Sequence, residues 1–321
     1  MTANAYDVAG TGLAALDRVV TGERRLFTEL GGSCGNVLIS LAMLGRSVVP
    51  LLRLGTDWVG NRLVKEFVDA GVDVHYISQK CDVRSPLIVQ HVDLDSAQHC
   101  FQFYAHESET VAPEYNSIEQ HQVDLATAVI RGSQFFYTDR LSAAIVEAME
   151  MASNAGTFVY FEPSRIDDEE LFSRALKATA ILKYSSERLG NYLNAIALKP
   201  GAIRIATHGK NGLEIFQDHH YVRKEAINLD VVRDTCGAGD MVTVGIIDWV
   251  LSKYPGTSSQ LHIADFVAGV EAGQRLAAAN CAYPGARGLF RDRGADVARR
   301  LLDNGSYECN YQPCFWEEPT E

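Results

Sequence analysis

The residues best suited to chemistry form one short segment, Asp234 to Asp240, with the sequence D-T-C-G-A-G-D. Two glycines around an alanine let a backbone fold tightly, so that successive N–H groups point into one concavity. A helix is predicted over Met241–Leu251, and its positive end adds to the attraction for an anion. Such a loop suits a phosphoryl group, and the Asp240 carboxylate is placed to accept a proton from an attacking hydroxyl. The plainer alternative is a glycine-rich turn with an acidic helix start.

The elements that must position this segment follow a strand-and-helix rhythm. Buried strands are predicted over Phe135–Thr138 and Thr157–Phe161, with a helix over Ser142–Asn154 between them. Such spacing indicates a mostly parallel sheet covered on both faces. Further elements of this rhythm are the helices Val37–Leu44 and Gly60–Ala70, the strands Val48–Leu54, Ala180–Lys183 and Ile203–Thr207, a strand starting near Asp73, and the helix after Gly239.

Two alternating stretches interrupt this rhythm. Arg84–Val92 and His99–Tyr104 read as an antiparallel hairpin, and Arg18–Leu30 supplies another strand beside it. A small sheet attached to an α/β body is a natural lid over a ligand cleft. We therefore expect one domain over residues 1–303, with the lid from about 17–30 and 83–105, and a surface tail over residues 304–321.

Composition excludes several classes of protein. The 321 residues are 47% hydrophobic and 22% charged, as in an ordinary globular protein, and the net charge of −12 argues against a nucleic-acid surface. The seven cysteines include no C-x-x-C pair, which is typical of reduced thiols in the cytoplasm. No leader is expected at the start, and no apolar run approaches the ~20 residues that span a membrane.

The segment D-T-C-G-A-G-D resembles the C-terminal signature of the ribokinase/PfkB family of carbohydrate kinases. A second stretch, G-G-S-C-G-N at residues 31–36, is similar to the N-terminal G-G-x-x-x-N signature of that family. Further pieces fall in family order, and the resemblance covers residues 6 to 300. These pieces are Asp17, Gly55-Thr56-Asp57 with Gly60, Arg84-Ser85-Pro86, and the stretch from Thr207 to Gly212.

The resemblance implies a ribokinase-like three-layer α/β fold with a mostly parallel central sheet and a small β-sheet lid. It also implies ATP-dependent phosphorylation of a hydroxyl, expected to be a primary alcohol, on a small sugar or sugar-like substrate. Asp240 would be the general base. The loop residues Gly237, Ala238 and Gly239 would form the anion hole for the transferred group.

The resemblance assigns two groups of binding residues. Asp17 and Asn36 would hydrogen-bond substrate hydroxyls, since a carboxylate and an amide offer the acceptors and donors that a polyol needs. Gly31 and Gly32 would let the backbone approach the sugar. On the nucleotide side, the residues assigned to cofactor binding are Thr207, Gly209, Gly212, Lys183, Arg165 and Thr235.

Magnesium is implied by ATP chemistry rather than by a cluster of ligands. The family usually carries N-x-x-E near the metal, whereas this sequence has Ser185 where Asn is common. Glu187 is the nearest acid, and we assign it an indirect role at Mg²⁺. A monovalent cation such as K⁺ is bound in several relatives near the equivalent loop, and Asp234 and Gly285 occupy comparable places.

The substrate is less closely specified. Asp139 and Arg140 follow a predicted strand, and ligands of open α/β sheets collect at strand C-termini. Arg140 there suits a carboxylate- or phosphate-bearing sugar, or else it pairs with Asp139. The stretch S-C-G within the N-terminal signature matches neither ribokinases, nor fructokinases, nor nucleoside kinases closely.

Three alternatives to a sugar kinase are weighed. A nucleoside kinase of the same family and a non-catalytic PfkB-like binding protein share the same motifs. The stretch G-T-G-L-A-A at residues 10–15 also fits the outline of a dinucleotide fingerprint, but the polar residues that follow leave no room for the helix that an NAD-dependent oxidoreductase needs. Finally, we expect a homodimer formed through the lid, because relatives often pair these sheets.

Overall fold

A computed structural model describes residues 6–93, 98–104, 115–193, 196, 198–229, 231–256 and 261–304. Its main sheet has the strand order β14-β13-β12-β11-β10-β9-β1-β4. Neighbouring strands are parallel from β12 to β4, and β13 and β14 add an antiparallel edge. The strands are β1 (Tyr6–Thr11), β4 (Val48–Pro50), β9 (Ser133–Thr138), β10 (Phe158–Phe161), β11 (Ile181–Ser185), β12 (Ile203–Thr207), β13 (Leu213–Gln217) and β14 (His220–Lys224).

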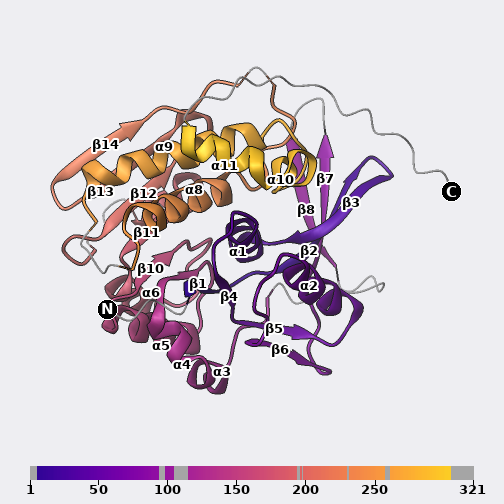
Figure 1. The fold of residues 1–321 in the computed structure, drawn as a ribbon, viewed down its shortest axis with the longest axis horizontal. Helices are drawn as coiled ribbons and strands as arrows, with labels where there is room; N and C mark the ends of the chain where they lie inside the picture. Colours follow the sequence, from indigo (N-terminus) through magenta and orange to yellow (C-terminus); the bar gives the residue numbers. More distant parts are fainter. Residues whose placement is uncertain are drawn as a thin grey trace.

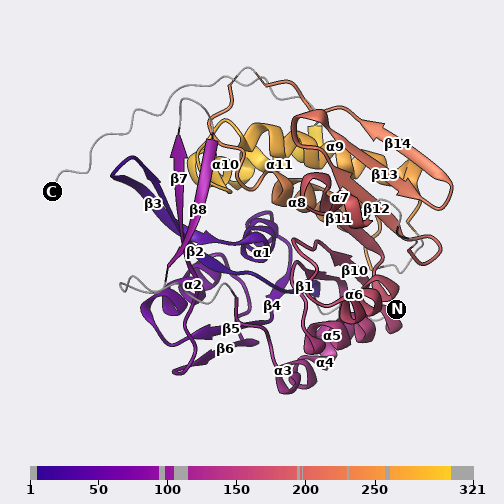
Figure 2. The same ribbon diagram turned by 180° about the vertical axis from the view of Figure 1, so that it is seen from behind.

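Helices cover both faces of this sheet (Figures 1 and 2). Apolar strand residues alternate between the two faces, so that Phe135 packs into one core and Phe136 into the other. On the Phe135 side lie α1 (Ser33–Met43), α8 (Ala238–Lys253), α9 (Ile263–Asn280), α10 (Gly288–Arg293) and α11 (Ala295–Asn304). On the Phe136 side lie α3 (Gln120–Leu125), α4 (Thr127–Gly132), α5 (Ala143–Asn154), α6 (Glu169–Ala178) and α7 (Ser186–Leu193).

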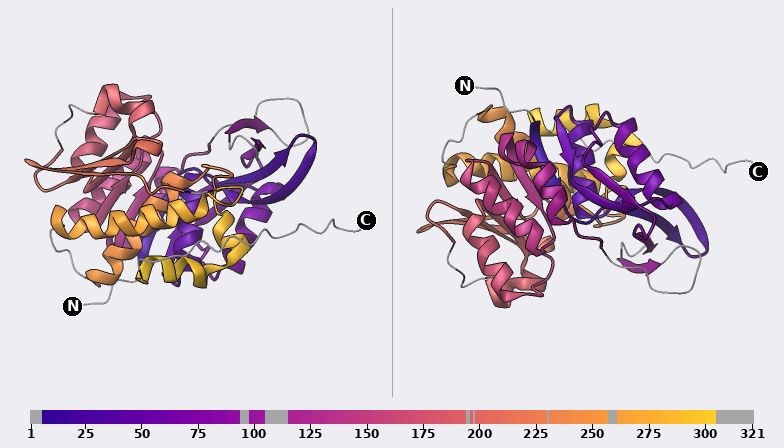
Figure 3. Two further views of the ribbon diagram at one scale, coloured as in Figure 1. Left: turned by 90° about the horizontal axis from the view of Figure 1, so that it is seen from above. Right: turned by 90° about the horizontal axis from the view of Figure 1, so that it is seen from below.

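The lid is a four-stranded sheet in the order β3-β2-β7-β8. It comprises β2 (Ala15–Thr21), β3 (Arg24–Gly31), β7 (Leu87–Asp93) and β8 (Gln98–Tyr104). The predicted hairpin is confirmed as the antiparallel pair β7–β8. The stretch predicted as one strand over Arg18–Leu30 is instead two, because the chain turns at Gly22, which has a φ of 57°. Figure 3 shows this sheet extending to one side of the body, away from β13 and β14.

The predicted α/β class is confirmed, and two local predictions need correction. Val48–Leu54 is not one strand: β4 pairs with β1 in the main sheet, whereas β5 (Leu52–Gly55) pairs with β6 (Ile77–Lys80) beside α2 (Trp58–Asp69). The chain changes partners at Leu51, whose N–H donates to Gly10 while Leu52 donates to Tyr76. The strand expected near Asp73 begins only at Ile77, as β6.

The start of the chain argues against the dinucleotide fingerprint. Gly10 and Gly12 are followed by strand β2, whereas a fingerprint of that kind opens a helix. The stretch G-T-G-L-A-A therefore joins the main sheet to the lid. The surface tail predicted for residues 304–321 lies almost wholly outside the described residues.

None of the helices in the part of the chain that the structure describes is long and apolar enough to cross a membrane. Within the same part, the cysteines are free thiols rather than disulfides: Cys34, Cys81, Cys100, Cys236 and Cys281.

The helix that carries Asp240 is held by an unusually close helix–helix contact. In α8, a Cβ added to Gly245 would lie 2.3 Å from the Cα of Gly273 in α9. A Cβ added to Gly273 would in turn lie 2.4 Å from the Val242 carbonyl oxygen. The absence of side chains at both glycines therefore allows α8 and α9 to pack this closely.

We expect Gly245→Ala to lower the free energy of unfolding by about 1–3 kcal/mol, because the added methyl overpacks this contact. On an unconstrained helix the same change would add up to about 1 kcal/mol of stability. Denaturant unfolding of the variant measures the difference. Lys253→Ala, on the exposed end of α8, is the control and should stay within about 0.5 kcal/mol of wild type. A stabilised Gly245→Ala protein would contradict the close-contact argument.

Candidate active site

The predicted anion loop forms the start of α8. Gly237 is the N-cap residue with a left-handed φ of 70°, and a Cβ there would lie 2.5 Å from the Ala286 carbonyl oxygen. Ala238 N–H donates to the Thr235 carbonyl at 3.2 Å, which closes the turn. The first N–H groups of a helix have no intrahelical acceptor, and the helix dipole favours an anion beside them. The segment thus forms a tight turn that opens a helix, as the sequence predicts.

Asp240 lies in the first turn of α8 with only 8% of its surface exposed. Its Oδ2 accepts a hydrogen bond of 2.8 Å from Asn36 Nδ2, which lies in α1. This bond joins the two predicted signatures, 204 residues apart in the sequence. The other amide atom, Asn36 Oδ1, is buried without a partner. The structure therefore brings the proposed base and one proposed substrate contact together.

Asp17 enters the same region from lid strand β2. Its Oδ1 is also buried without a partner. A Cβ added to Gly31 would lie 1.9 Å from Asp17 Oδ2, so glycine at 31 makes room for this carboxyl group rather than for the sugar alone. Gly32 has a φ of 76°, which favours glycine at this position. Buried polar atoms without partners are costly, and they are expected where a polar ligand completes the site.

Carboxyl groups in this region hold their protons unusually tightly. Burial and the nearby Glu29 raise the pKa of Asp17 to about 8. Burial and the charge of Glu162 raise the pKa of Asp240 to about 7, against the opposing effect of the Asn36 hydrogen bond. Burial likewise raises the pKa of Asp139 to about 6. Carboxyl groups with raised pKa values gathered in one place are typical of an active site.

Below the anion loop lies a buried charge pair. Lys183, which is 2% exposed, forms an ion pair with Glu162. Thr243 Oγ1 donates to Glu162 Oε2 at 2.7 Å, and this ties the pair to α8. A Cβ added to Gly239 would lie 3.6 Å from Lys183 Nζ, so the lysine lies against the loop. Lys183 is therefore part of the site, and Glu162 is a residue to which the sequence analysis gave no role.

One cavity of about 650 Å³ runs from the anion loop along β12 and α9. Most of the residues predicted to bind the nucleotide line it, and Gly212 there has the left-handed φ of 84° that favours glycine. The lining includes the predicted residues Glu187, Thr207, Gly209, Gly212, Thr235, Ala238 and Gly239. The cavity is large enough for a nucleotide and ends at the loop where a terminal phosphate would bind.

Asp139 and Arg140 pair with each other at the end of β9. Arg140 Nη1 donates to Asp139 Oδ2 at 2.9 Å and to Ser164 Oγ at 3.1 Å. Asp139 Oδ1 accepts from Leu13 N–H at 2.9 Å, which fixes the connection from β1 to β2. Of the two roles considered for Arg140, the structure shows the pairing with Asp139.

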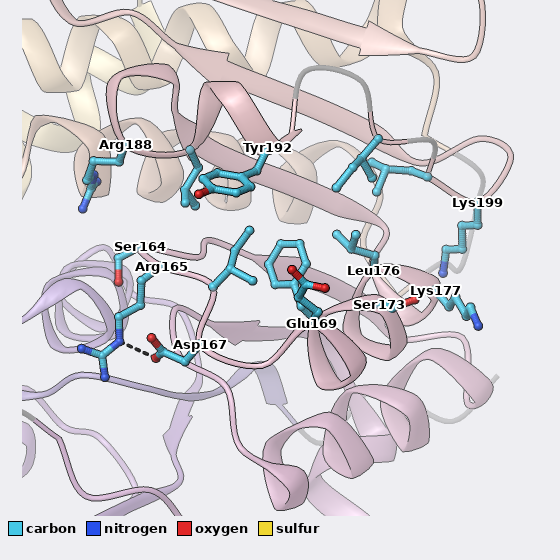
Figure 4. A pocket seen from close by; sticks show the side chains of 15 residues that line it. Ser164, Arg165, Asp167, Glu169, Ser173, Leu176, Lys177, Arg188, Tyr192 and Lys199 are labelled. Atoms are coloured by element: carbon cyan, nitrogen blue, oxygen red, sulfur yellow. Dashed lines mark ion pairs between the residues drawn. The ribbon is translucent and has the colours of Figure 1, made fainter.

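Arg165 lies apart from the 650 Å³ cavity. It lines a separate cleft of about 960 Å³ between α6 and α7. Figure 4 shows Arg165 beside Asp167 on one wall and Arg188 with Tyr192 on the other. Arg165 Nε lies 2.5 Å from Asp167 Oδ2, in an exposed ion pair. The structure does not bring Arg165 together with the other residues assigned to the cofactor.

Candidate metal ligands are sparse. Among residues 6–304 as far as they are described, no group of three or more His, Cys, Asp or Glu side chains could hold a metal ion. Glu187 lines the 650 Å³ cavity as a single exposed carboxylate. That arrangement fits Mg²⁺, which commonly binds through one or two carboxylates together with substrate phosphates. Asp234 and Gly285 do lie together, since Gly285 N–H donates to Asp234 Oδ2 at 2.8 Å.

A covered parallel sheet, a β-sheet lid and a cavity ending at an anion loop define the class of small-molecule kinases. Residues 8–292 match the family model described as pfkB family carbohydrate kinase. The chain belongs to this family, and its enzyme class is therefore that of the phosphotransferases. This confirms the family indicated by the two sequence signatures.

Individual relatives agree with the family match. A fructokinase of Escherichia coli is 28% identical over 260 residues, which are 74% of this chain and 81% of that protein. An aminoimidazole riboside kinase of Salmonella typhimurium is 26% identical over 263 residues, 74% of this chain and 78% of that protein. A fructokinase structure with bound ATP from Xylella fastidiosa has a TM-score of 0.71 at 19% identity, and the match covers 88% of this chain and 94% of that one. This likeness confirms the ribokinase-like fold.

Some residues close to the site belong to none of the sequence motifs. Gln90 and His99 on the lid contact Asp234, and Asn280 contacts the Ala286 carbonyl. A polar residue inside the apolar run L-I-V-Q-H-V was a signal for Gln90, because a buried glutamine needs a partner. The sequence contains no comparable signal for His99 or Asn280.

We expect Asp17→Asn to raise the thermal stability of the protein more at about pH 8 than at about pH 5. A carboxyl group whose pKa is raised by folding costs no stability below its unfolded pKa, near 3.9, and costs progressively more up to its folded pKa. The neutral amide removes that cost. Melting curves across this pH range measure it, with the exposed Asp124→Asn as control. A stability difference that shrinks with rising pH would refute the raised pKa.

Proposed function

We propose that this protein transfers the terminal phosphoryl group of ATP to a hydroxyl of a small sugar or sugar-like molecule, with Asp240 as general base. The observation that carries the proposal is the position of Asp240. Its buried carboxyl group stands in the first turn of α8, on the loop that lines the 650 Å³ cavity, and it is bonded to Asn36 at 2.8 Å. A base, an anion-binding loop and unpartnered acceptors thus meet at one point.

The side chains have separate tasks in this proposal. Asp17 Oδ1 and Asn36 Oδ1 accept hydrogen bonds from substrate hydroxyls, which gives both buried atoms a partner. Asn36 Nδ2 holds the Asp240 carboxyl group in place, and Asp240 accepts the proton of the attacking hydroxyl. The amides from Gly237 to Gly239 stabilise the charge on the transferred group.

The phosphoryl donor occupies the cavity lined by Thr207, Gly209 and Gly212. The choice of ATP is supported by the similar structure from Xylella fastidiosa, which has ATP bound. Magnesium would enter with the nucleotide, and Glu187 would hold it through water. When bound, Mg²⁺ neutralises charge on the phosphates. Lys183 keeps the charge of Glu162 balanced beside the loop, so that the loop stays attractive to an anion.

For the acceptor, we favour a neutral polyol. Arg140 is the cation that would recognise an acidic sugar, and its guanidinium is engaged by Asp139 and Ser164. A ribonucleoside-type acceptor is the second candidate, because one curated relative is an aminoimidazole riboside kinase. A panel of hexoses, pentoses, sugar acids and nucleosides with ATP separates these possibilities. The homodimer formed through the lid and the cytoplasmic location stay predictions.

We expect Asp240→Asn to lower kcat by about 10²–10⁴-fold, which is the usual contribution of a general base. The KM for the sugar should stay within about threefold, because the amide preserves the shape of the site. Steady-state kinetics measure both, with Asp296→Asn, an exposed first-turn aspartate of α11, as the matched control. Full activity of Asp240→Asn would refute the base assignment. Tight sugar binding by a wild-type protein without turnover would favour the non-catalytic alternative.

The pH dependence of kcat/KM should have an acid limb with an apparent pKa of about 7. Below that pH Asp240 is protonated and accepts no further proton, so the rate falls about tenfold per pH unit. Glu162→Gln should move this limb to lower pH, because it removes a negative charge that raises the pKa of Asp240 and leaves Lys183 to lower it. Glu170→Gln, on the exposed face of α6, should leave the limb in place. A shift of the limb to higher pH in Glu162→Gln would contradict this account.

A further inference from the structure

The fully buried carboxyl group of Asp234 connects the lid to the anion loop. From the lid, Gln90 Nε2 lies 2.6 Å from Asp234 Oδ2, and His99 Nδ1 lies 3.0 Å from Asp234 Oδ1. From the body, Cys236 N–H donates to Oδ1 at 2.9 Å and Gly285 N–H donates to Oδ2 at 2.8 Å. Asp234 is 0% exposed. Two lid side chains and two backbone amides therefore share one carboxylate.

This donor set does not fit the monovalent cation expected beside Asp234 and Gly285. A carboxylate offers about four lone-pair positions. Three N–H groups donate hydrogen bonds to Asp234, and His99 Nδ1 lies at ion-pair distance from it. Gly285 turns its amide N–H, not its carbonyl, toward Asp234. The neighbouring carbonyl of Ala286 accepts from Asn280 Nδ2 at 3.0 Å, so it too has a donor. These contacts occupy the Asp234 carboxylate, which is the group expected to bind the cation, and they leave it poorly suited to that role.

We propose that Gln90 and His99 are positioning residues that hold Asp234, and through it the anion loop, in place of a monovalent cation. This inference rests on the proposed kinase function, because it assigns a role within that reaction. Asp234 reaches the loop directly, since its Oδ1 fixes the N–H of Cys236, the residue before Gly237. Removing the lid contacts would free the carboxylate to turn and would loosen the loop that receives the phosphoryl group.

The lid presents these residues on the same face as Asp17. Asp17 lies opposite Ile88 in the β2–β7 pair, and Gln90 is two residues further along β7. His99 lies opposite Val92, two residues beyond Gln90, in the β7–β8 pair. Because residues two apart on a strand share a face, Asp17, Gln90 and His99 all point toward the body. The lid strands that cover the sugar thus also hold the loop that serves the phosphate, which couples acceptor binding to the organisation of the phosphoryl site.

The kinetic test compares His99→Leu and Gln90→Leu with wild type. We expect kcat to fall about tenfold in each, with the KM for the sugar changed less than about twofold, because the contacts act on the loop and not on the acceptor. His99→Asn should recover most of the loss, since its amide nitrogen can replace Nδ1. Cys100→Ala is the matched control: it is the next residue on β8, is exposed, and lies on the opposite face. A kcat of wild-type size in both leucine variants would overturn the proposal.

A second arm replaces potassium with tetramethylammonium at constant ionic strength. Wild-type rates should agree within about twofold, because the Asp234 carboxylate that would bind K⁺ already has its donors. Saturable activation by K⁺ of tenfold or more would overturn the inference.

A third arm needs no catalysis and separates this inference from the proposed function. Amide hydrogen exchange over residues 234–240 should be faster in His99→Leu and Gln90→Leu than in wild type and Cys100→Ala. If wild type phosphorylates no acceptor but the exchange pattern appears, the proposed function fails and the positioning role stands. Unchanged exchange in both leucine variants would refute the positioning role, whatever the activity.

Discussion

The structure depends on burying several carboxyl groups close together in a protein that already carries a net charge of −12. Water solvates a carboxylate better than a protein interior does, so each buried group needs donors or keeps its proton. Asn36 serves Asp240, and the N–H of Leu13 serves Asp139. Asp17 retains an oxygen with no partner. Burying this oxygen without a hydrogen bond costs free energy when no ligand is bound. A polyol would supply the missing hydrogen bond.

Because of this constraint, elements that are far apart in the sequence must meet. The start of α8, the start of α1, the lid and the connection after β1 all contribute to one small volume, and close approach is possible only without side chains. A Cβ at Gly12 would lie 1.7 Å from an Asp139 oxygen, and one at Gly31 would lie 1.9 Å from an Asp17 oxygen. Glycines around the site therefore have two roles: some shape the anion loop, and others make space for the carboxyl groups.

Sequence reasoning was most useful where a local pattern of residues decides the local structure. Segment Asp234–Asp240 carries its own chemistry, and the rhythm of strands and helices was sufficient for the α/β class. The predicted strand boundaries were wrong where the choice of a neighbouring strand decides them. Nothing in the local sequence shows that the chain leaves the main sheet at Leu51 to pair with β6. The contact of His99 with Asp234 could not be predicted either, because the two residues are far apart in the sequence. For Arg165 the family resemblance implied a nucleotide contact, whereas the side chain lines another cleft.

Two residues of opposite charge, Glu162 and Lys183, balance each other beside the anion loop. β10 and β11 are neighbouring parallel strands, so the residue that follows Phe161 comes near the end of β11. There Glu162 forms an ion pair with Lys183. A negative charge alone would repel a phosphate at Gly239, and a positive charge alone would hold Asp240 ionised at lower pH. As a pair they leave the loop attractive to an anion and keep the pKa of Asp240 at about 7.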